Sequence, residues 1–265
     1  MSGAITLPAA EVAPDDYFDL RGALQALDSG APVTFPPMHM TRVRIGGRNL
    51  TFCTNFAKDP VQRMQRKGRF YEDDDLREVA KFLPKAPRVL DVGANVGNHA
   101  MYFATQCGAE SVVVIEPNPL ALAPLVANIL LNDLGGVIRT EALGIGLGAK
   151  SEGGLYMRRR LQNLGGTRMQ RDMGGDLEVH PGDALFADEQ FDLIKIDVEG
   201  MEMDVLAGLE LTIARCRPLI FIEVDDENTA AFDDWCAARG YVPRYEVRRY
   251  NVNKNYLVQP VGETA

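Results

Sequence analysis

From residue 88 onward, short apolar segments alternate with segments of helical pattern, and this alternation limits the folds open to the chain. Apolar strands separated by helices form a mostly parallel sheet covered by helices on both faces. We therefore predict an α/β fold with a doubly wound, mostly parallel sheet. Such sheets bind ligands at the carboxyl ends of their strands, near the topological switch point. The expected strands lie at 88–93, 111–117, 137–143, 191–197 and 218–224.

Two further parts complete the predicted architecture. Residues 241–247 and 255–260 predict an antiparallel strand pair that closes the main domain, 70–265. Residues 1–69 predict an N-terminal extension packed on the main sheet. Within it we expect a short helix capped by Asp15-Asp16 and ended by Gly30, and a β-hairpin over 42–53.

Composition excludes several classes of protein. The 265 residues carry 28 basic and 37 acidic side chains, a formal net charge of −9, which argues against a nucleic-acid partner. The four cysteines lie far apart in the sequence, so reduced thiols in a cytoplasmic protein are expected, and no zinc site. No apolar run is long enough for a membrane span, and the acidic N-terminus lacks the basic start of a signal peptide.

The first strand of the alternation ends in a glycine loop, Asp91-x-Gly93-x-Asn95-x-Gly97. A strand that turns through such a loop into a helix leaves backbone N–H groups and the positive helix end facing one spot. That spot suits the anionic part of a nucleotide-like cofactor.

The residues leave two cofactors open, a dinucleotide and S-adenosylmethionine (SAM). A dinucleotide loop requires the spacing G-x-G-x-x-G, whereas Asn95 occupies the middle position here. Asp91 suits the ammonium of SAM better than it suits two phosphates. Glu116, at the end of the second strand, can accept hydrogen bonds from ribose hydroxyls in either cofactor, so it does not discriminate.

Three blocks of sequence resemble one known family. They are 89–104 with the glycine loop, 112–132, and 191–210, which contains LIKIDVEGMEMDVL and is followed by RPLIFIEV. The chain resembles the FkbM-family methyltransferases from about Phe70 to Pro260. These are class I, SAM-dependent enzymes with a Rossmann-like sheet that mostly methylate hydroxyl groups of sugars and natural products.

The resemblance implies a set of cofactor-binding residues. The glycine loop and the start of its helix would hold the methionine end of SAM, and Glu116 would bind the ribose. Tyr71 and Glu72 match an aromatic-Glu pair that precedes the core in this family and would close over the cofactor. For Tyr71, the alternative is that it packs the leading helix onto the sheet. The implied residues are Tyr71, Glu72, Asp91, Gly93, Asn95, Gly97, Asn98, Glu116, Pro117, Asn118, Ala142 and Leu143, the last four beside the adenine.

Catalytic candidates follow the fourth strand. An alcohol is a poor nucleophile at neutral pH, so methylation of a hydroxyl benefits from a general base. Asp197 is the first candidate for that base or for a hydroxyl anchor, with Glu199 as its neighbour or as a charge at the next helix start. Lys195 lies in a buried strand, where an unpaired ammonium is costly, so we expect it to pair with Asp91, Glu223 or Asp197 and to organise the site.

Further polar residues carry weaker predictions. His180 is a candidate base, and His99 is a candidate for contact with the cofactor or the substrate; a surface or packing role is the alternative for both. Asn163 resembles a family residue near the substrate, or is a turn residue. Asp183 matches a family position without a clear role. Asp197 and Glu199 lack an obvious third ligand, so no metal is predicted.

Two segments allow two interpretations each. The helix over 120–132 is apolar nearly all round, which predicts either outward-facing alanines or cover by the extension, or else a homodimer interface. The Gly/Arg-rich insertion at about 144–183 predicts a solvated hairpin or a wall that attracts an anionic acceptor. Its basic side chains are Arg158, Arg159, Arg160, Arg168 and Arg171.

The combined prediction is a SAM-dependent methyltransferase that methylates a hydroxyl of a small molecule or glycan. An NAD-dependent oxidoreductase on the same fold and a non-catalytic SAM-binding module are the alternatives.

Overall fold

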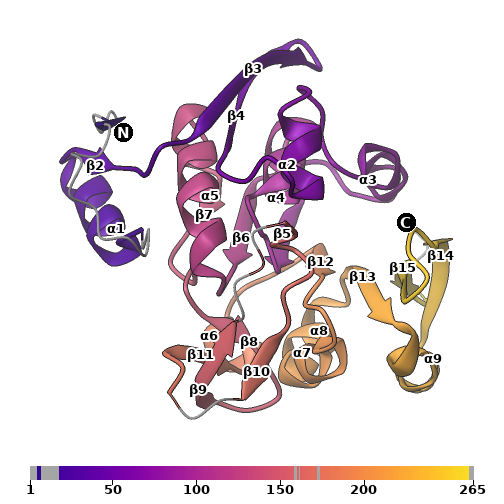
Figure 1. The fold of residues 1–265 in the computed structure, drawn as a ribbon. Helices are drawn as coiled ribbons and strands as arrows, with labels where there is room; N and C mark the ends of the chain where they lie inside the picture. The colour runs from indigo at the N-terminus through magenta and orange to yellow at the C-terminus, as the bar shows by residue number, and fades with distance from the viewer. Residues whose placement is uncertain (1–4, 7–17, 158–159, 161, 172–173, 263–265) are drawn as a thin grey trace.

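The computed structural model describes residues 5–6, 18–157, 160, 162–171 and 174–262, and the predicted alternation forms one central sheet in it (Figure 1). The sheet has the strand order β14-β15-β13-β12-β5-β6-β7. The last five of these run parallel, and β15 pairs antiparallel with both β13 and β14. The doubly wound sheet with its antiparallel C-terminal pair is therefore confirmed. Its strands are β5 (Arg88–Val92), β6 (Ser111–Ile115), β7 (Ile138–Arg139), β12 (Leu193–Ile196), β13 (Leu219–Asp225), β14 (Tyr241–Val247) and β15 (Asn253–Pro260).

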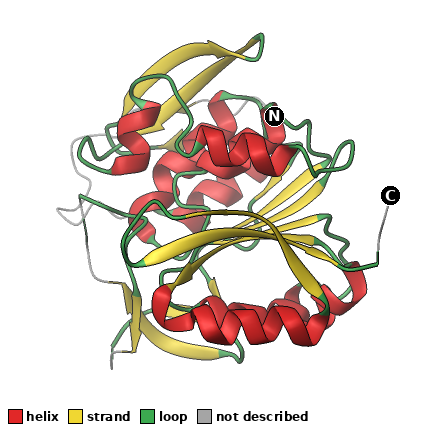
Figure 2. Cartoon of the chain, turned by 90° about the vertical axis from the view of Figure 1, so that its right-hand side faces the viewer, coloured by secondary structure: helices red, strands yellow, loops and turns green. Residues whose placement is uncertain are grey.

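Helices cover both faces of this sheet (Figure 2). Successive strand residues point to opposite faces, so neighbours such as Val89 and Leu90 belong to two different apolar clusters. The segment after β12 forms two helices that meet at Leu209. One cluster is covered by α4 (Asn98–Thr105) and α5 (Pro119–Leu131). The other cluster is covered by α7 (Glu202–Gly208), α8 (Glu210–Cys216) and α9 (Thr229–Arg239). The short helix η1 (Asp226–Asn228) directly precedes α9.

The N-terminal extension packs against the helix α5 of the main domain. The expected hairpin is formed by β3 (His39–Ile45) and β4 (Arg48–Thr54). The short helix α1 (Leu20–Ser29) ends at Gly30 in a left-handed conformation, but its cap is Asp19; Asp15 and Asp16 lie outside the described residues. The remaining elements of this part are β1 (Ile5–Thr6), β2 (Val33–Thr34), α2 (Pro60–Gln65) and α3 (Asp73–Ala80).

The apolar helix α5 is covered by the hairpin of the extension. The backbone N–H of Cys53 on β4 donates to Oδ1 of Asn128 at 2.6 Å, and Asn132 bonds the backbone of Thr51. Residues 121–129 of the helix are buried. The first interpretation of this helix is therefore confirmed, and its apolar surface is not available for a homodimer.

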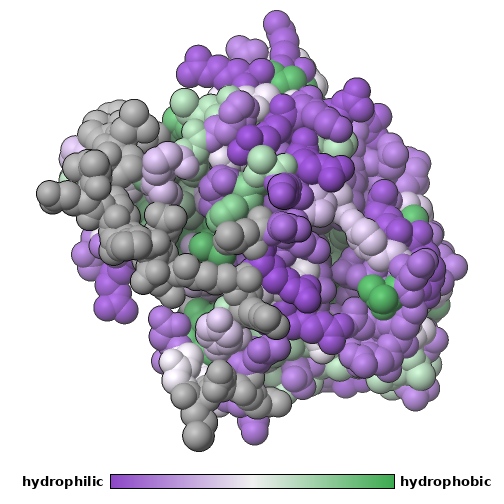
Figure 3. All heavy atoms as spheres, in the orientation of Figure 1, coloured by the Kyte–Doolittle hydropathy of each residue, from purple (hydrophilic) through white to green (hydrophobic). Residues whose placement is uncertain are grey.

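Hydrophilic side chains predominate on the face of the molecule drawn in Figure 3.

The insertion folds as a second, four-stranded sheet with the order β10-β9-β11-β8. It lies below the main sheet in Figure 1. The predicted hairpin is present, since β9 and β10 pair antiparallel, but these two strands form only half of the second sheet. The elements are β8 (Gly146–Leu147), β9 (Glu152–Met157), β10 (Met169–Arg171), β11 (Leu177–His180) and the following α6 (Gly182–Leu185). In the described part of the chain, no helix is both long and apolar enough to cross a bilayer.

Candidate active site

Two adjoining cavities open at the carboxyl ends of β5 and β12, the switch point of the sheet. The wide cavity has a volume of about 460 Å³ and extends from the glycine loop to Tyr250 and Asn253. The narrow slot has a volume of about 60 Å³ and extends from the same loop to Glu116 and the second sheet. Six residues line both and mark the junction: Gly93, Asn95, Gly165, Thr167, Asp197 and Glu199.

The glycine loop needs its first glycine for two reasons. Gly93 has a φ of +77°, and a Cβ there would lie 1.8 Å from the carbonyl oxygen of Asp197. Asn95 also adopts a positive φ, +51°, which asparagine tolerates better than most residues. The loops that follow β5 and β12 can touch only because residue 93 has no side chain.

Glu116 joins the glycine loop to the end of β6. It is 5% exposed and accepts backbone hydrogen bonds from Asn95 at 2.6 Å and from Asn118 at 2.7 Å. Burial raises the pKa of Glu116 to about 7, although these two hydrogen bonds oppose the shift. Glu116 and Pro117 line the slot, whereas Asn118 caps α5 through Leu120 and lines neither cavity.

Lys195 pairs as predicted with the carboxylate on the neighbouring strand. The register of β5 and β12 places it beside Asp91, and its Nζ lies 3.1 Å from Asp91 Oδ1. The same ammonium donates to the carbonyl oxygen of Gly93 at 2.6 Å and lies 3.8 Å from Asp197 Oδ2. Burial opposes the charge on Lys195, but Asp91 and Asp197 outweigh it and raise its pKa. One buried ammonium thus fixes the glycine loop and faces the candidate base.

Five of the expected cofactor residues, Asn118 among them, are not at the cavity walls. Asp91 is fully buried against Lys195, so its carboxylate faces an ammonium of the protein and not a cavity. Gly97 provides the left-handed start of α4. Ala142 and Leu143 are buried beside β6, where Leu143 bridges to Glu116, and the slot is instead lined by Gly146 and Leu147 of β8.

Three carboxylates meet at the ends of β12 and β13. Oxygen atoms of Asp197, Glu199 and Glu223 all lie within 4.8 Å of one another. Burial, reinforced by the neighbouring carboxylates, raises the pKa of Glu199 to about 8 and that of Glu223 to about 10. Burial also raises the pKa of Asp197, while Lys195 opposes that shift.

Two of these carboxylates differ from the sequence interpretation. Glu199 is not in a helical first turn: its φ is +54°, and α7 starts at Glu202. The sequence predicts Glu223 only as a partner for Lys195, but it lies beside Asp197 near the end of β13, where the side-chain amide of Asn253 donates to it at 2.7 Å. It supplies the third carboxylate that the sequence lacked, but an acidic cluster alone does not define a metal site.

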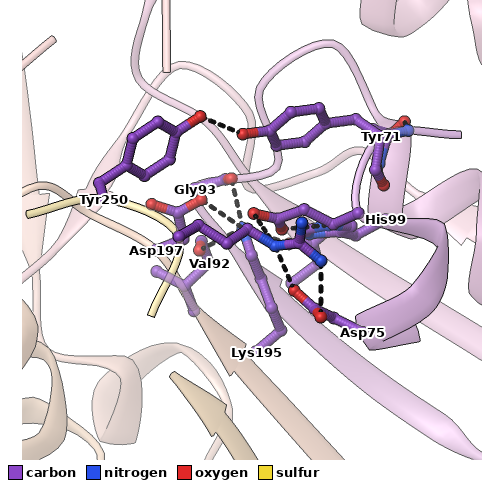
Figure 4. Close-up of polar contacts among 12 residues, drawn as sticks. Tyr71, Asp75, Val92, Gly93, His99, Lys195, Asp197 and Tyr250 are labelled. Atoms are coloured by element: carbon purple, nitrogen blue, oxygen red, sulfur yellow. Dashed lines mark hydrogen bonds and ion pairs between the residues drawn. The ribbon is translucent and has the colours of Figure 1, made fainter. Parts of the chain in front are cut away.

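The wide cavity has a roof made by two distant segments. The hydroxyl oxygens of Tyr71 and Tyr250 lie 2.5 Å apart, above Asp197 and Lys195 (Figure 4). Arg249 pairs with Asp75 of α3 at 2.7 Å, which ties the β14–β15 connection to the start of the core. Burial, with Glu72 nearby, raises the pKa of Tyr71. No sequence pattern indicates a role for Tyr250, because 179 residues separate it from its partner.

The other expected residues at this end of the cavity are close together. Asn98 bonds the backbone of Tyr71 in both directions at 3.0 Å, so it positions the roof. His99 Nε2 lies 3.3 Å from a carboxylate oxygen of Glu72. All four of these side chains line the wide cavity.

The weaker candidates divide between the cavity and the scaffold. His180 lines neither cavity; it contacts Ser151 and Glu178 on the second sheet, each at 3.2 Å. Asp183 accepts the N–H groups of Leu211 and Thr212 at the start of α8, a structural role. Asn163 lines the wide cavity and also closes a turn.

The insertion contributes charge to the wide cavity, but the charge is balanced. Arg160 and Arg168 line it; Arg158 and Arg159 lie outside the described residues, as does the side chain of Arg171. Arg168 is paired with Asp225, and four carboxylates line the same cavity. This balance lends no support to an anionic acceptor.

Comparison with known proteins gives one family. A model of the methyltransferase FkbM domain matches residues 91–243, more than half of the chain. The methyltransferase sdnD of Sordaria araneosa is 26% identical over 164 residues, covering 48% of this chain and 62% of the relative. The AMB antimetabolite synthetase AmbE of Pseudomonas aeruginosa is 29% identical over 192 residues, covering 56% of this chain and 9% of the relative. The chain therefore spans less than two thirds of the length of either.

Solved structures with related folds are more distant in sequence. TrmK of M. capricolum, solved with S-adenosylhomocysteine (SAH), is 12% identical with a TM-score of 0.47, covering 72% of this chain and 69% of that one. Sp1610 of Streptococcus pneumoniae, a putative tRNA (m1A22) methyltransferase solved with SAM, is 14% identical with the same TM-score, covering 74% and 75%. Similarity at this level carries no information on the acceptor.

Proposed function

Because the chain belongs to the FkbM methyltransferase family, we propose that it transfers the methyl group of SAM to a hydroxyl of a sugar or another small natural product. SAM is the cofactor of this family, which removes the basis for the dinucleotide alternative. The hydroxyl acceptor rests on the chemistry of the cavity walls.

The residues present fit SAM in two adjoining parts. The slot brings together a carboxylate for ribose hydroxyls, Glu116, and apolar side chains for a purine. The wide cavity begins at the glycine loop, where Glu72 and the carbonyl oxygen of Gly93 would receive the ammonium that Asp91 cannot reach. The methyl group, when SAM is bound, reacts by direct displacement and needs little from the protein beyond alignment.

One observation carries the proposal: Asp197 lies at the junction of the two cavities, within 3.8 Å of the buried Lys195. Burial raises the pKa of Asp197 and Lys195 opposes that shift; a carboxylate with a raised pKa is a better proton acceptor, so Asp197 would accept the proton of an acceptor hydroxyl as it is methylated. The pKa values of Glu199, about 8, and of Glu223, about 10, lie above neutral pH, so these two groups would be protonated there and would donate hydrogen bonds to the acceptor.

The size of the wide cavity supports a small acceptor. Its volume of about 460 Å³ falls within the range of roughly 300–1,000 Å³ that is usual for small-molecule sites. The name of one relative, an antimetabolite synthetase, agrees with an acceptor from natural-product chemistry.

The test combines binding and turnover. Calorimetry should show binding of SAH and none of NADH, and SAM with a ¹³C-labelled methyl should label a hydroxyl oxygen in a panel of sugars and natural products. Asp197→Asn should retain SAH binding but lower turnover by about 100-fold or more, as expected for loss of a general base. Asp188→Asn, at an exposed carboxylate, is the matched control. Labelling of nitrogen only, or full turnover in Asp197→Asn, would contradict the proposal.

A further inference from the structure

The Gly/Arg-rich insertion reaches both cavities with one stretch of chain. On β10 and the residue before it, Arg168 and Gln170 line the wide cavity, whereas Met169 between them lines the slot. This is the two-residue alternation of an extended strand. Each face of the stretch therefore serves a different ligand site.

The slot side of this stretch is formed by thioethers. Met157 lies opposite Met169 in the register of β9 and β10, and Met201 at the start of α7 completes the group. The neighbouring Gly146 makes room for them, since a Cβ there would lie 2.8 Å from Cε of Met169. Glu116 and Pro117 line the same slot.

Methionine suits this position for a physical reason. Its unbranched, polarizable side chain adapts to irregular space and makes favourable contacts with flat aromatic rings. A slot of about 60 Å³ is narrow for a purine, and walls of methionine are those that move aside most easily.

The stretch is held to the core at points other than the methionines. The backbone N–H of Leu164 donates to Asp59 Oδ2 at 2.8 Å, and Leu164 packs with Val96 and Ala121. Farther along, Arg168 pairs with Asp225 at the end of β13. Residues 165–167, which line the wide cavity, therefore lie between these anchors, and Met169 follows directly after the second one.

We propose that Met157 and Met169 are cofactor-positioning residues supplied by the insertion, and that their contact with the nucleoside of SAM orders residues 162–170 as a wall for the acceptor. The inference rests on the proposed function, because it requires SAM as cofactor. It adds that cofactor binding precedes and promotes acceptor binding.

The first test is SAH binding by calorimetry to the full chain. The double variant Met157→Ala/Met169→Ala should bind SAH about tenfold more weakly than the unaltered protein, through loss of two thioether–ring contacts. Met40→Ala, at an exposed methionine on β3, should bind as the unaltered protein does, and Met169→Leu should recover part of the affinity. Near-ultraviolet circular dichroism establishes that each variant is folded.

The second test is hydrogen exchange of residues 162–170. SAH should slow exchange in this segment of the unaltered protein, and saturating SAH should do so less in the double variant. Affinity within twofold of the unaltered protein, or exchange in 162–170 unaffected by SAH, would overturn the inference. Failure of the unaltered protein to bind SAH would instead overturn the proposed function.

Discussion

The buried ammonium of Lys195 gives the sharpest prediction on stability. Lys195 is 2% exposed, and Asp91 is fully buried with no hydrogen-bond donor to its carboxylate oxygens among the described residues apart from this ion pair. The variant Lys195→Met would leave that carboxylate uncompensated. Breaking a buried pair from one side costs about 3–5 kcal/mol, so we expect the free energy of unfolding to fall by that amount.

Urea unfolding followed by far-ultraviolet circular dichroism measures the change. Lys85→Met, at an exposed lysine, is the control and should unfold as the unaltered protein does. The double variant Lys195→Met/Asp91→Leu should recover most of the loss, because both charges are removed together. A loss below about 1 kcal/mol in Lys195→Met, or a double variant less stable than the single one, would refute the role of the pair.

Three further predictions concern the walls and supports of the site. Gly93→Ala should abolish measurable SAH binding in calorimetry, since its Cβ meets the Asp197 carbonyl, whereas Gly47→Ala shares the positive φ without the clash and should bind normally. Glu223→Gln should raise the melting temperature at pH 8–9 but not near pH 4. The pKa of Glu223 is about 10 in the folded state, so the folded state retains a proton that the unfolded chain loses above about pH 4.3. The unaltered protein therefore loses stability as the pH rises from about 4.3 to about 10, and the neutral glutamine avoids that loss. An equal change at both pH values in a thermal scan would contradict this. Asn128→Leu should lower the free energy of unfolding by about 1–3 kcal/mol in urea, because the N–H of Cys53 and the carbonyl of Val96 lose a buried partner; a change near zero would show that water replaces it.

Local pattern was sufficient for the framework of the fold. Apolar runs, glycine turns and helical periodicity placed the strands of the main sheet, the hairpin of the extension and the end of α1 at Gly30. The pairing of Lys195 followed from burial alone, because a mid-strand ammonium between parallel strands needs a carboxylate on a neighbour. The cap of α1 was predicted wrongly, because several acidic residues lie close together before this helix and Asp19 is the one that caps it.

The site depended more on contacts between distant segments. The glycine loop, Glu116 and the Asp197 region were identified from sequence because each follows a strand whose end is fixed by the sheet. Tyr250, Glu223 and the methionines of the insertion were missed, since nothing in their local pattern indicates which cavity they face. Asp91 shows the difference most clearly. Its position near the end of a strand predicted contact with the cofactor, but the register of β5 and β12 places its carboxylate beside Lys195.

The sequence by itself thus determined the sheet, the loop that opens the site and the class of protein, because these depend on periodicity and on residues near one another in the chain. Only the tertiary structure decided which carboxylates face the cavities, which residues cover the wide cavity and which cavity walls the insertion supplies. Those properties depend on side chains brought together across as many as 179 residues, and on the burial that sets their charge.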